Sequence, residues 1–223
     1  MAARRLVVAC IGSLALALAV GEVAPAGTDR RTEANPSALL AGIPQHGLWL
    51  GRPGAKLVLV EYVDLQCPFC ARFSREVFPQ VVRRYVRTGR VQVLFRGLAF
   101  VGPDSVVGLR WVLAAGHQNS LWNVLEVLYA RQGAENSGWI TRTRLISAAR
   151  AVPGLRVDRL RRESTSAGVT AEIRAAANAA HAARVPGTPY FEAGRSLIQL
   201  APLRLTSFDA NDFSAQLDAL LRR

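Results

Sequence analysis

The stretch from residue 57 to residue 70 constrains the fold more than any other part of this 223-residue chain. Its first half, Leu57–Val63, is a short apolar run rich in β-branched residues, which is typical of a buried strand. A helical pattern begins soon afterwards, within the sequence Cys67-Pro68-Phe69-Cys70. Pro68 occupies the first helical position, where the missing N–H of proline costs no hydrogen bond. The sequence therefore predicts a strand, a tight turn and a helix whose N-cap residue is Cys67.

This placement predicts different chemistry for the two cysteines. The sulfur of Cys67 would face the free amide groups and the positive end of the helix dipole. We expect its thiol to be acidified and exposed, whereas Cys70, one helical turn further along, is more shielded. An acidified thiol beside a shielded one indicates a redox pair.

The first 26 residues have the features of an export signal. Arg4 and Arg5 precede an apolar run from Leu6 to Val20, and the small-residue site Ala24-Pro25-Ala26 follows. The apolar run is shorter than the roughly 20 residues that a membrane-spanning helix needs. We expect cleavage after Ala26, with retention of residues 1–26 as an N-terminal membrane anchor as the alternative. Residues 27–42 are polar and lack periodicity, so they are expected to form a flexible lead.

The cysteine count favours redox chemistry over a structural role. Of three cysteines, Cys10 lies within the expected signal, so Cys67 and Cys70 are the pair left in the mature chain. A single bridge across a two-residue gap would close too small a loop to restrain the unfolded chain. A structural zinc site needs four ligands, and none of the three histidines is spaced as a ligand partner of the cysteines. We therefore expect neither a metal nor any other cofactor.

The chain is basic, with a formal charge of +12, and all its basic residues except Lys56 are arginine. The segment Arg142–Arg162 contains seven arginines and a single acid, Asp158. Such a patch can attract nucleic acid or an anionic membrane surface. Because no aromatic interleaving or binding motif accompanies it, we interpret it as a solvated face and expect no nucleic-acid partner.

The elements around the cysteines follow an α/β order. The helix that begins at the cysteines has a wide apolar face, is expected to kink at Pro79 and ends near Gly89. A strand follows at Val91–Arg96, which completes a strand–helix–strand unit with parallel strands. A possible short edge strand, residues 46–50, precedes it. Residues 98–168 show helical patterns with no strand signal, and we assign their aromatic residues to a core: Trp111, Trp122, Tyr129 and Trp139.

The C-terminal part predicts a second half of the sheet. A helix over Thr170–Ala183 leads into a strand that ends near Phe191. We expect residues 192–195 to form a turn, residues 196–200 to form a second strand, and Asp212–Leu221 to form the last helix. Two such halves in one sheet imply an α/β sandwich.

Taken together, these motifs resemble the thioredoxin superfamily and, within it, the exported thiol oxidases of the DsbA type. The resemblance covers about residues 43–222, and we treat 43–223 as one domain. It rests on the cysteine motif after a strand, Glu61 six residues before Cys67, the helical segment, and the sequence Gly187-Thr188-Pro189. It implies a thioredoxin fold with a helical insertion, about residues 98–168, between the βαβ and ββα halves.

The resemblance also implies roles for individual residues. Cys67 would react with substrate and Cys70 would resolve the intermediate, while Glu61 would be a buried acid that relays a proton to Cys70. Pro189 resembles the cis-proline of the family, and Thr188 would offer its backbone to an extended substrate peptide.

The residues between the cysteines, Pro68 and Phe69, would belong to the substrate-binding surface. The best-known DsbA enzymes have histidine where this chain has Phe69, which provides no cationic donor to the thiolate. We therefore expect an oxidising pair that is less extreme than in those enzymes.

The implied function is an exported thiol–disulfide oxidoreductase of the periplasm or cell envelope that introduces disulfides into substrate proteins. By resemblance, a membrane partner linked to quinones, of the DsbB or vitamin K epoxide reductase (VKOR) type, would reoxidise it. We expect a monomer. Two alternatives stay open: an envelope disulfide reductase or isomerase, and a peptide-binding or folding-helper module whose cysteines are incidental.

Overall fold

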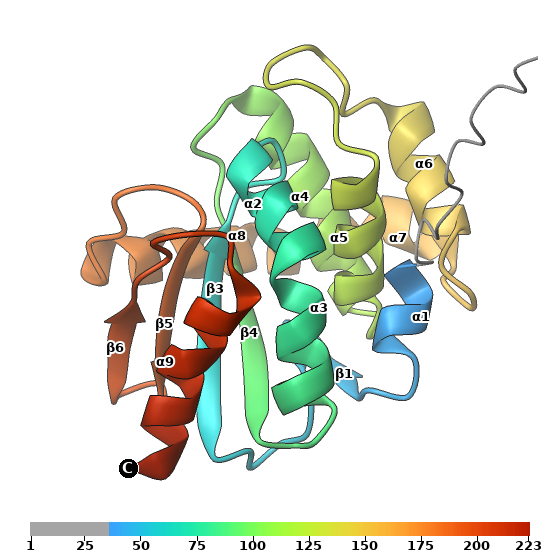
Figure 1. Cartoon of the computed structure of the whole chain (residues 1–223). Helices are drawn as coiled ribbons and strands as arrows, with labels where there is room; N and C mark the ends of the chain where they lie inside the picture. The colour runs from blue at the N-terminus through green and yellow to red at the C-terminus, as the bar shows by residue number, and fades with distance from the viewer. Residues whose placement is uncertain (1–35) are drawn as a thin grey trace, which may run out of the picture. The chain divides into compact units, whose positions relative to one another are not determined.

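The structure, a computed structural model, describes residues 36–223 of the chain. The expected signal peptide or anchor and most of the expected lead lie outside the described residues. Six strands form one mixed sheet in the order β1-β2-β4-β3-β5-β6 (Figure 1). Their bounds are Gln45–His46 (β1), Trp49–Leu50 (β2), Leu57–Val63 (β3), Val91–Gly97 (β4), Tyr190–Gly194 (β5) and Leu200–Leu203 (β6). Residues 36–223 include no helix with the length and apolar content of a membrane span.

The central strand, β3, is parallel to β4 and antiparallel to β5. Because successive side chains of a strand point to opposite faces, Leu57, Leu59 and Val63 enter the main core. Val60 and Tyr62 point to the other face and join a smaller apolar cluster. The predicted α/β sandwich with a parallel βαβ unit is confirmed.

The helix after the cysteines is broken, as its proline predicts. It comprises α2 (Pro68–Glu76), α3 (Phe78–Val81) and a π-helical turn, η1 (Val82–Val86). Pro79 lies in the first turn of α3, where its missing N–H is tolerated, and the chain bends at Val77. Gly89 then adopts a left-handed conformation with φ of +73°, in agreement with its expected role in ending the helix.

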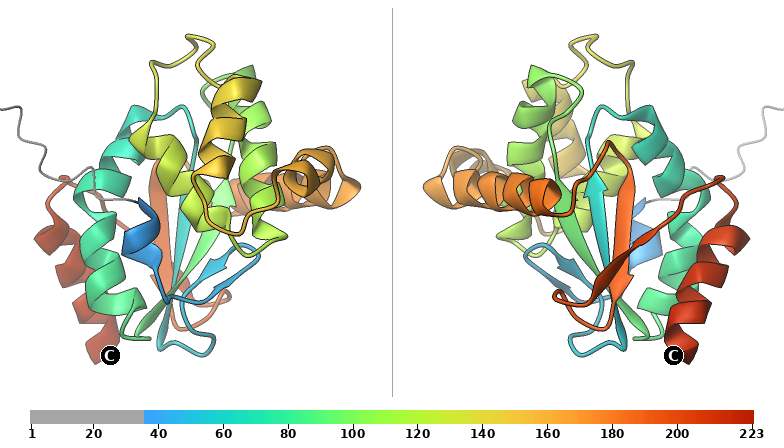
Figure 2. Two further views of the ribbon diagram at one scale, coloured as in Figure 1. Left: turned by 90° about the vertical axis from the view of Figure 1, so that its right-hand side faces the viewer. Right: turned by 90° about the vertical axis from the view of Figure 1, so that its left-hand side faces the viewer.

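The main core lies between the sheet and the layer formed by α2, α3 and α9 (Ala210–Arg222) (Figures 1 and 2). Three fully buried rings join these layers. The Phe73 centroid lies 4.4 Å from that of Phe191 and 5.2 Å from that of Phe213. Such contacts connect the helix of the cysteines to both the strand after Pro189 and the C-terminal helix.

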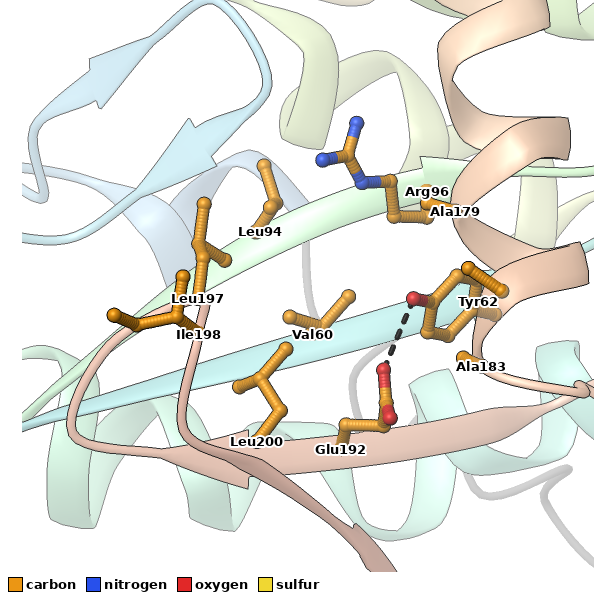
Figure 3. Close-up of a pocket in the computed structure, with 11 residues that line it drawn as sticks. Val60, Tyr62, Leu94, Arg96, Ala179, Ala183, Glu192, Leu197, Ile198 and Leu200 are labelled. Carbon is orange, nitrogen blue, oxygen red and sulfur yellow. Dashed lines mark hydrogen bonds between the residues drawn. The ribbon is translucent and has the colours of Figure 1, made fainter.

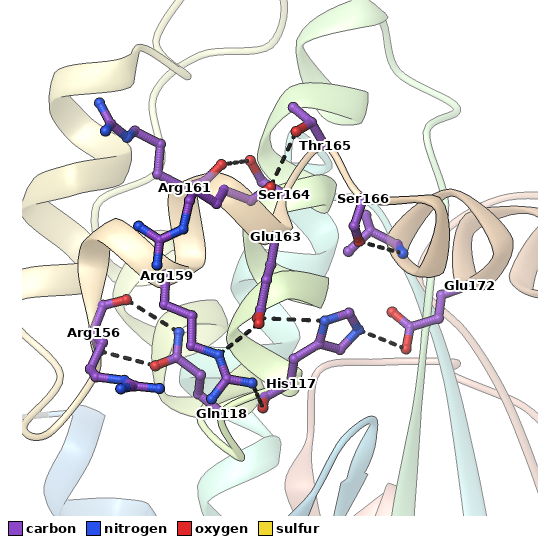
Figure 4. Close-up of polar contacts among 12 residues, drawn as sticks. His117, Gln118, Arg156, Arg159, Arg161, Glu163, Ser164, Thr165, Ser166 and Glu172 are labelled. Atoms are coloured by element: carbon purple, nitrogen blue, oxygen red, sulfur yellow. Dashed lines mark hydrogen bonds and ion pairs between the residues drawn. The ribbon is translucent and has the colours of Figure 1, made fainter.

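The insertion is entirely helical, as predicted, with α4 (Pro103–Gly116), α5 (Leu121–Ala130), α6 (Arg142–Arg150) and α7 (Val157–Glu163). Its four aromatic residues are buried, which confirms their assignment to the core. His117, just after α4, lies between two acids (Figure 4). Its Nδ1 is 3.6 Å from Glu163 Oε2, and its Nε2 is 3.3 Å from Glu172 Oε1, on α8 (Ala167–Ala182). This contact links the insertion to α8.

The arginine-rich segment is mostly a solvated face, as interpreted. Six of its seven arginines are exposed. The seventh, Arg159, is half-buried and pairs with Glu163 at 2.6 Å.

Three expected boundaries are wrong. Residues 192–194 are not a turn: they extend β5, because Val58, Leu59 and Val60 of β3 pair with them. The second strand consequently begins at Leu200 rather than at residue 196. Residues 36–40, expected in a flexible lead, form the helix α1 (Pro36–Leu40), and Leu40 is buried in the core.

The expected edge strand over residues 46–50 is instead a pair of two-residue strands. Gly47, with φ of +58°, lies in the turn between β1 and β2, which pair antiparallel.

The opposite face of the sheet is covered less completely, and α8 is the helix of residues 36–223 that packs on it (Figure 2). Beside α8, a cavity of about 310 Å³ opens between the strands and the β5–β6 loop (Figure 3). Tyr62 and Glu192 meet at its base, where the tyrosine hydroxyl donates a 3.0 Å hydrogen bond to Glu192 Oε2. Leu197 and Ile198 lie at its rim and are exposed.

Candidate active site

The two cysteines lie at the N-terminus of α2, directly after the turn that follows β3. Cys67 is the N-cap residue and Pro68 the first helical residue, as predicted. Both thiols are free, and Cys70 is fully buried. The expectation that Cys67 is exposed is wrong, since it is only 5% exposed. The chain at Thr188 covers it: the Cys67 thiol donates a 3.2 Å hydrogen bond to the Thr188 carbonyl.

The surroundings of the two thiols separate their acidities. The pKa of Cys67 is lowered to about 6, chiefly because the Cys70 thiol donates a hydrogen bond to its sulfur. Burial opposes this shift, while the Thr188 side chain and the amides of Phe69 and Cys70 add to it. The pKa of Cys70 is raised well above its usual value, first by burial and then by Cys67. At neutral pH the reduced pair therefore holds one thiolate, at Cys67, and one thiol.

The peptide bond between Thr188 and Pro189 is cis, as expected from the resemblance. The bond lies just before β5, whose pairing with β3 brings it beside the start of α2. In this way two segments separated by 121 positions meet at the Cys67 sulfur. Both residues are half-buried. Their role in binding a substrate peptide stays a prediction.

Glu61 is buried in the sheet beneath α2, as predicted, and is 3% exposed. Its Oε2 atom has no hydrogen-bond partner in the described part of the chain. Its pKa is raised to about 8, mainly by burial and secondly by the charge of Glu126 on α5. A carboxyl of this kind keeps its proton at neutral pH and can give it to a neighbouring base.

A second buried acid, Asp64, was not identified from the sequence. Its Oδ2 accepts hydrogen bonds from the amides of Phe100 and Val101, at 2.6 and 2.9 Å. Its Oδ1 accepts from the Gln66 amide at 2.8 Å and from the Ser105 hydroxyl at 2.6 Å. Asp64 therefore fixes the turn between β3 and Cys67. An aspartate whose side chain accepts from the amide two residues further on is a local turn signal that could have indicated part of this role.

The insertion helix α5 also supports the turn between β3 and Cys67. The sequence did not indicate this role of α5. The Tyr129 hydroxyl donates to the Asp64 carbonyl at 3.3 Å. Beyond the end of the helix, Gln132 Nε2 donates to the carbonyls of Leu65 and Cys67, at 2.8 and 3.1 Å. Tyr129 was identified only as a core residue; the contacts show that it also positions the cysteine turn.

The residues between the cysteines form an exposed apolar surface. Phe69 is 56% exposed, and Pro68 is exposed beside it. The Phe69 ring stacks on Phe208, with centroids 6.2 Å apart. The Arg72 guanidinium covers the Phe208 ring at 4.3 Å. This surface borders Cys67 and suits contact with apolar side chains of a partner.

No group of histidine, cysteine and acidic residues within residues 36–223 is arranged to hold a metal ion. The described site consists of two thiols, buried carboxyls and backbone donors.

Comparisons with known proteins agree with this geometry. A family model described as thioredoxin matches residues 44–202. The probable disulfide bond formation protein D of Bacillus anthracis is 28% identical over 147 residues, which span 63% of this chain and 66% of that protein. The chain thus matches just under two thirds of that relative's length.

Solved structures share the fold. Oxidised BdbD from Bacillus subtilis aligns with a TM-score of 0.69 and 18% identity, covering 81% of this chain and 98% of that one. DsbA from Chlamydia trachomatis aligns with a TM-score of 0.66 and 17% identity, covering 78% of this chain and 91% of that one. The chain therefore belongs to the thioredoxin family and has the fold of the DsbA-like oxidoreductases.

Proposed function

We propose that the protein is an exported thiol–disulfide oxidoreductase that acts chiefly as a DsbA-like oxidase of substrate proteins. The observation that carries this proposal is the separation in acidity between Cys67 and Cys70. A stabilised Cys67 thiolate favours the reduced form of the pair, and a disulfide whose reduced form is stable is a strong oxidant. The names of the relatives and the DsbA-like fold support the same activity.

The site geometry gives a sequence of steps. A substrate thiolate attacks the Cys67 sulfur, the Cys67–Cys70 bond breaks, and a mixed disulfide forms. The Cys70 sulfur leaves as a thiolate and takes a proton, which Glu61 can supply. A second substrate thiolate then attacks the substrate sulfur of the mixed disulfide. The product leaves with its new disulfide, and Cys67 leaves as the stabilised thiolate.

Substrate binding would use the surface around Cys67. An extended peptide could pair with the backbone at Thr188 and Pro189, while Pro68 and Phe69 contact its side chains. We propose that a quinone-linked membrane partner of the DsbB or VKOR type reoxidises the pair, that the protein works in the periplasm or cell envelope, and that it acts as a monomer. The family resemblance supports the reoxidant, and the export-signal pattern of residues 1–26 supports the location.

Substitution of each cysteine tests the activity. Oxidised protein mixed with a reduced, unfolded substrate protein should lower the free-thiol count of that substrate, and Cys67→Ser should abolish this. Cys70→Ser is the matched control: it also cannot form the disulfide, but its Cys67 should still be alkylated rapidly near neutral pH. Full oxidation by Cys67→Ser would refute the proposal.

The same assay addresses the two alternatives. A reductase would leave substrate thiols unchanged but would cleave an existing substrate disulfide when supplied with electrons. A peptide-binding module would bind unfolded peptide equally well after both cysteines are replaced.

A further inference from the structure

Glu126, on the insertion helix α5, is a second buried carboxyl that the steps above do not use. It is 6% exposed, and its Oε2 accepts a 2.9 Å hydrogen bond from the Ser74 hydroxyl. Ser74 lies one helical turn after Cys70 on α2. The Glu126 carboxyl therefore contacts the helix that positions the cysteines, from the side opposite its exposed surface.

The nearby side chains of β3 and α5 are acidic or neutral. The Tyr129 hydroxyl, one turn after Glu126 on α5, reaches the Asp64 carbonyl just after β3, so α5 lies beside the end of β3 that contains Glu61. In agreement, the charge of Glu126 raises the pKa of Glu61. Tyr129, one turn further along α5, is influenced by the charges of Glu61, Asp64 and both cysteines. Arg75, the residue after Ser74, is basic but exposed. Its Nη1 donates a 3.4 Å hydrogen bond to the Tyr129 carbonyl. Within residues 36–223, neither Glu61 nor Glu126 has a salt-bridge partner.

Two buried carboxyls without a cation cannot both ionise easily. Burial penalises each negative charge, and ionisation of one opposes ionisation of the other. In agreement, burial raises the pKa of Glu126 to about 8, although the Ser74 hydrogen bond lowers it. The two groups are therefore expected to lose their protons in two coupled steps.

We propose that Glu126 is a positioning residue for the proton of Glu61. The two carboxyls form a coupled pair in the core beside α2, and the charge on Glu126 sets the highest pH at which Glu61 can still protonate the Cys70 sulfur. This inference rests on the proposed function. When substrate attacks the disulfide, the Cys70 thiolate gains the Glu61 proton and Glu61 becomes a carboxylate. On reoxidation, the Cys67 thiolate first forms a mixed disulfide with a disulfide of the reoxidant. The Cys70 thiol then returns its proton to Glu61, and the Cys70 thiolate attacks the Cys67 sulfur, which re-forms the Cys67–Cys70 bond and releases the reoxidant's thiolate. The insertion thus acts on the redox centre through charge as well as through packing.

Carboxyl-carbon NMR of the full protein, labelled at glutamate, tests the pairing without any need for activity. In the wild-type protein the Glu61 signal should titrate well above an ordinary glutamate and in two steps. In Glu126→Gln, which keeps the shape and an acceptor for Ser74, it should titrate in one step at a pH lower by about one unit. Ser74→Ala, which no longer stabilises the charge on Glu126, should move it in the same direction by less. Glu172→Gln, which removes a partly buried acid on α8, should not move it.

The same variants test the consequence for the reaction. The rate at which the oxidised protein forms the mixed disulfide should fall at high pH as Glu61 loses its proton. In Glu126→Gln this fall should occur at a pH lower by about one unit. A Glu61 titration that Glu126→Gln leaves unchanged would overturn the inference, whatever the activity. A titration that moves in a protein unable to oxidise any substrate would instead refute the proposed function and leave the carboxyl pair standing.

Discussion

Each face of the sheet contains a buried acidic side chain, but the two differ in their hydrogen bonding. Glu61 and Tyr62 are neighbours on β3 and therefore point to opposite faces. On the core face, Glu61 has an oxygen without a hydrogen-bond partner among the described residues, and its pKa is raised to about 8. On the other face, Glu192 accepts a hydrogen bond from Tyr62 at the base of the cavity (Figure 3). A hydrogen-bonded acid supports the structure, whereas burial of an acid with an unpartnered oxygen costs stability, and the proposed function would use its proton.

The largest difference between the faces should appear in packing. Phe191→Ala, on the core face, should lower the free energy of unfolding by about 3–5 kcal/mol, because it empties the contact with Phe73 and Phe213. Its neighbour Tyr190 points to the other face and is half-buried. Tyr190→Ala should cost about 1 kcal/mol. Urea unfolding monitored by circular dichroism measures both. Equal losses would mean that the two faces contribute alike to stability.

The next contrast concerns catalysis. Glu61→Gln should slow mixed-disulfide formation by about 10²-fold at pH 7, because Cys70 loses its proton donor. Glu192→Gln, the matched change on the opposite face, should leave this rate within about twofold, since Glu192 lies with Tyr62 on the other side of the sheet. Stopped-flow measurement with a reduced peptide gives both rates. A similar slowing in the two variants would show that burial of a carboxyl alone, rather than its position, affects the reaction.

Stability should respond in opposite directions to changes at adjacent residues. Folded Glu61 keeps its proton up to about pH 8, whereas an ordinary glutamate releases it near 4.5. Folding must therefore take up a proton between about pH 4.5 and pH 8, and the free-energy cost of this uptake rises with pH. Glu61→Gln removes that cost, so it should stabilise the protein, by at most about 3 kcal/mol at pH 7 and not at all below pH 4.5.

Tyr62→Phe should have the opposite sign, because Glu192 loses its hydrogen-bond donor. The expected loss is about 1–3 kcal/mol. Urea unfolding at a series of pH values compares the two variants. Destabilisation by Glu61→Gln at pH 7 would contradict the view that Glu61 is retained at a cost to stability.

The smallest expected effect concerns the contribution of Cys70 to the lowered pKa of Cys67. In the reduced protein, the alkylation rate of Cys67 should rise with a midpoint near pH 6. Cys70→Ala removes the main donor to the Cys67 sulfur and should raise this midpoint by about one unit. Cys70→Ser keeps a donor and should raise it less. Equal midpoints in the two variants would attribute the acidity of Cys67 to the helix N-terminus alone.

Local patterns in the sequence predicted the parts of the site that depend on neighbours in the chain. Three such signals are the apolar run of β3, Pro68 at the start of α2 and Pro79 at the bend. Each affects the backbone only within a few residues. The predicted turn at residues 192–195 failed for the opposite reason. Gly194 is typical of a turn, but pairing with β3 keeps residues 192–194 in the strand. Tertiary contacts outweighed local preference there.

The polar contacts of the insertion could not be read from periodicity. Glu126 meets Ser74 across 52 positions, and Gln132 meets the Cys67 carbonyl across 65. The apolar pattern of residues 121–129 indicated a helix and a core but not which polar atoms would face α2. The cover over Cys67 comes from Thr188, 121 positions away, which is why its burial was not anticipated.

The reduction potential of the Cys67–Cys70 pair tests the central claim most directly, by equilibration of the purified protein in glutathione buffers. The stabilised Cys67 thiolate predicts a potential well above the value of about −270 mV typical of thioredoxin, toward the roughly −120 mV of the strongest oxidants of this kind. A value at or below that of thioredoxin would contradict the oxidase assignment and favour a reductase.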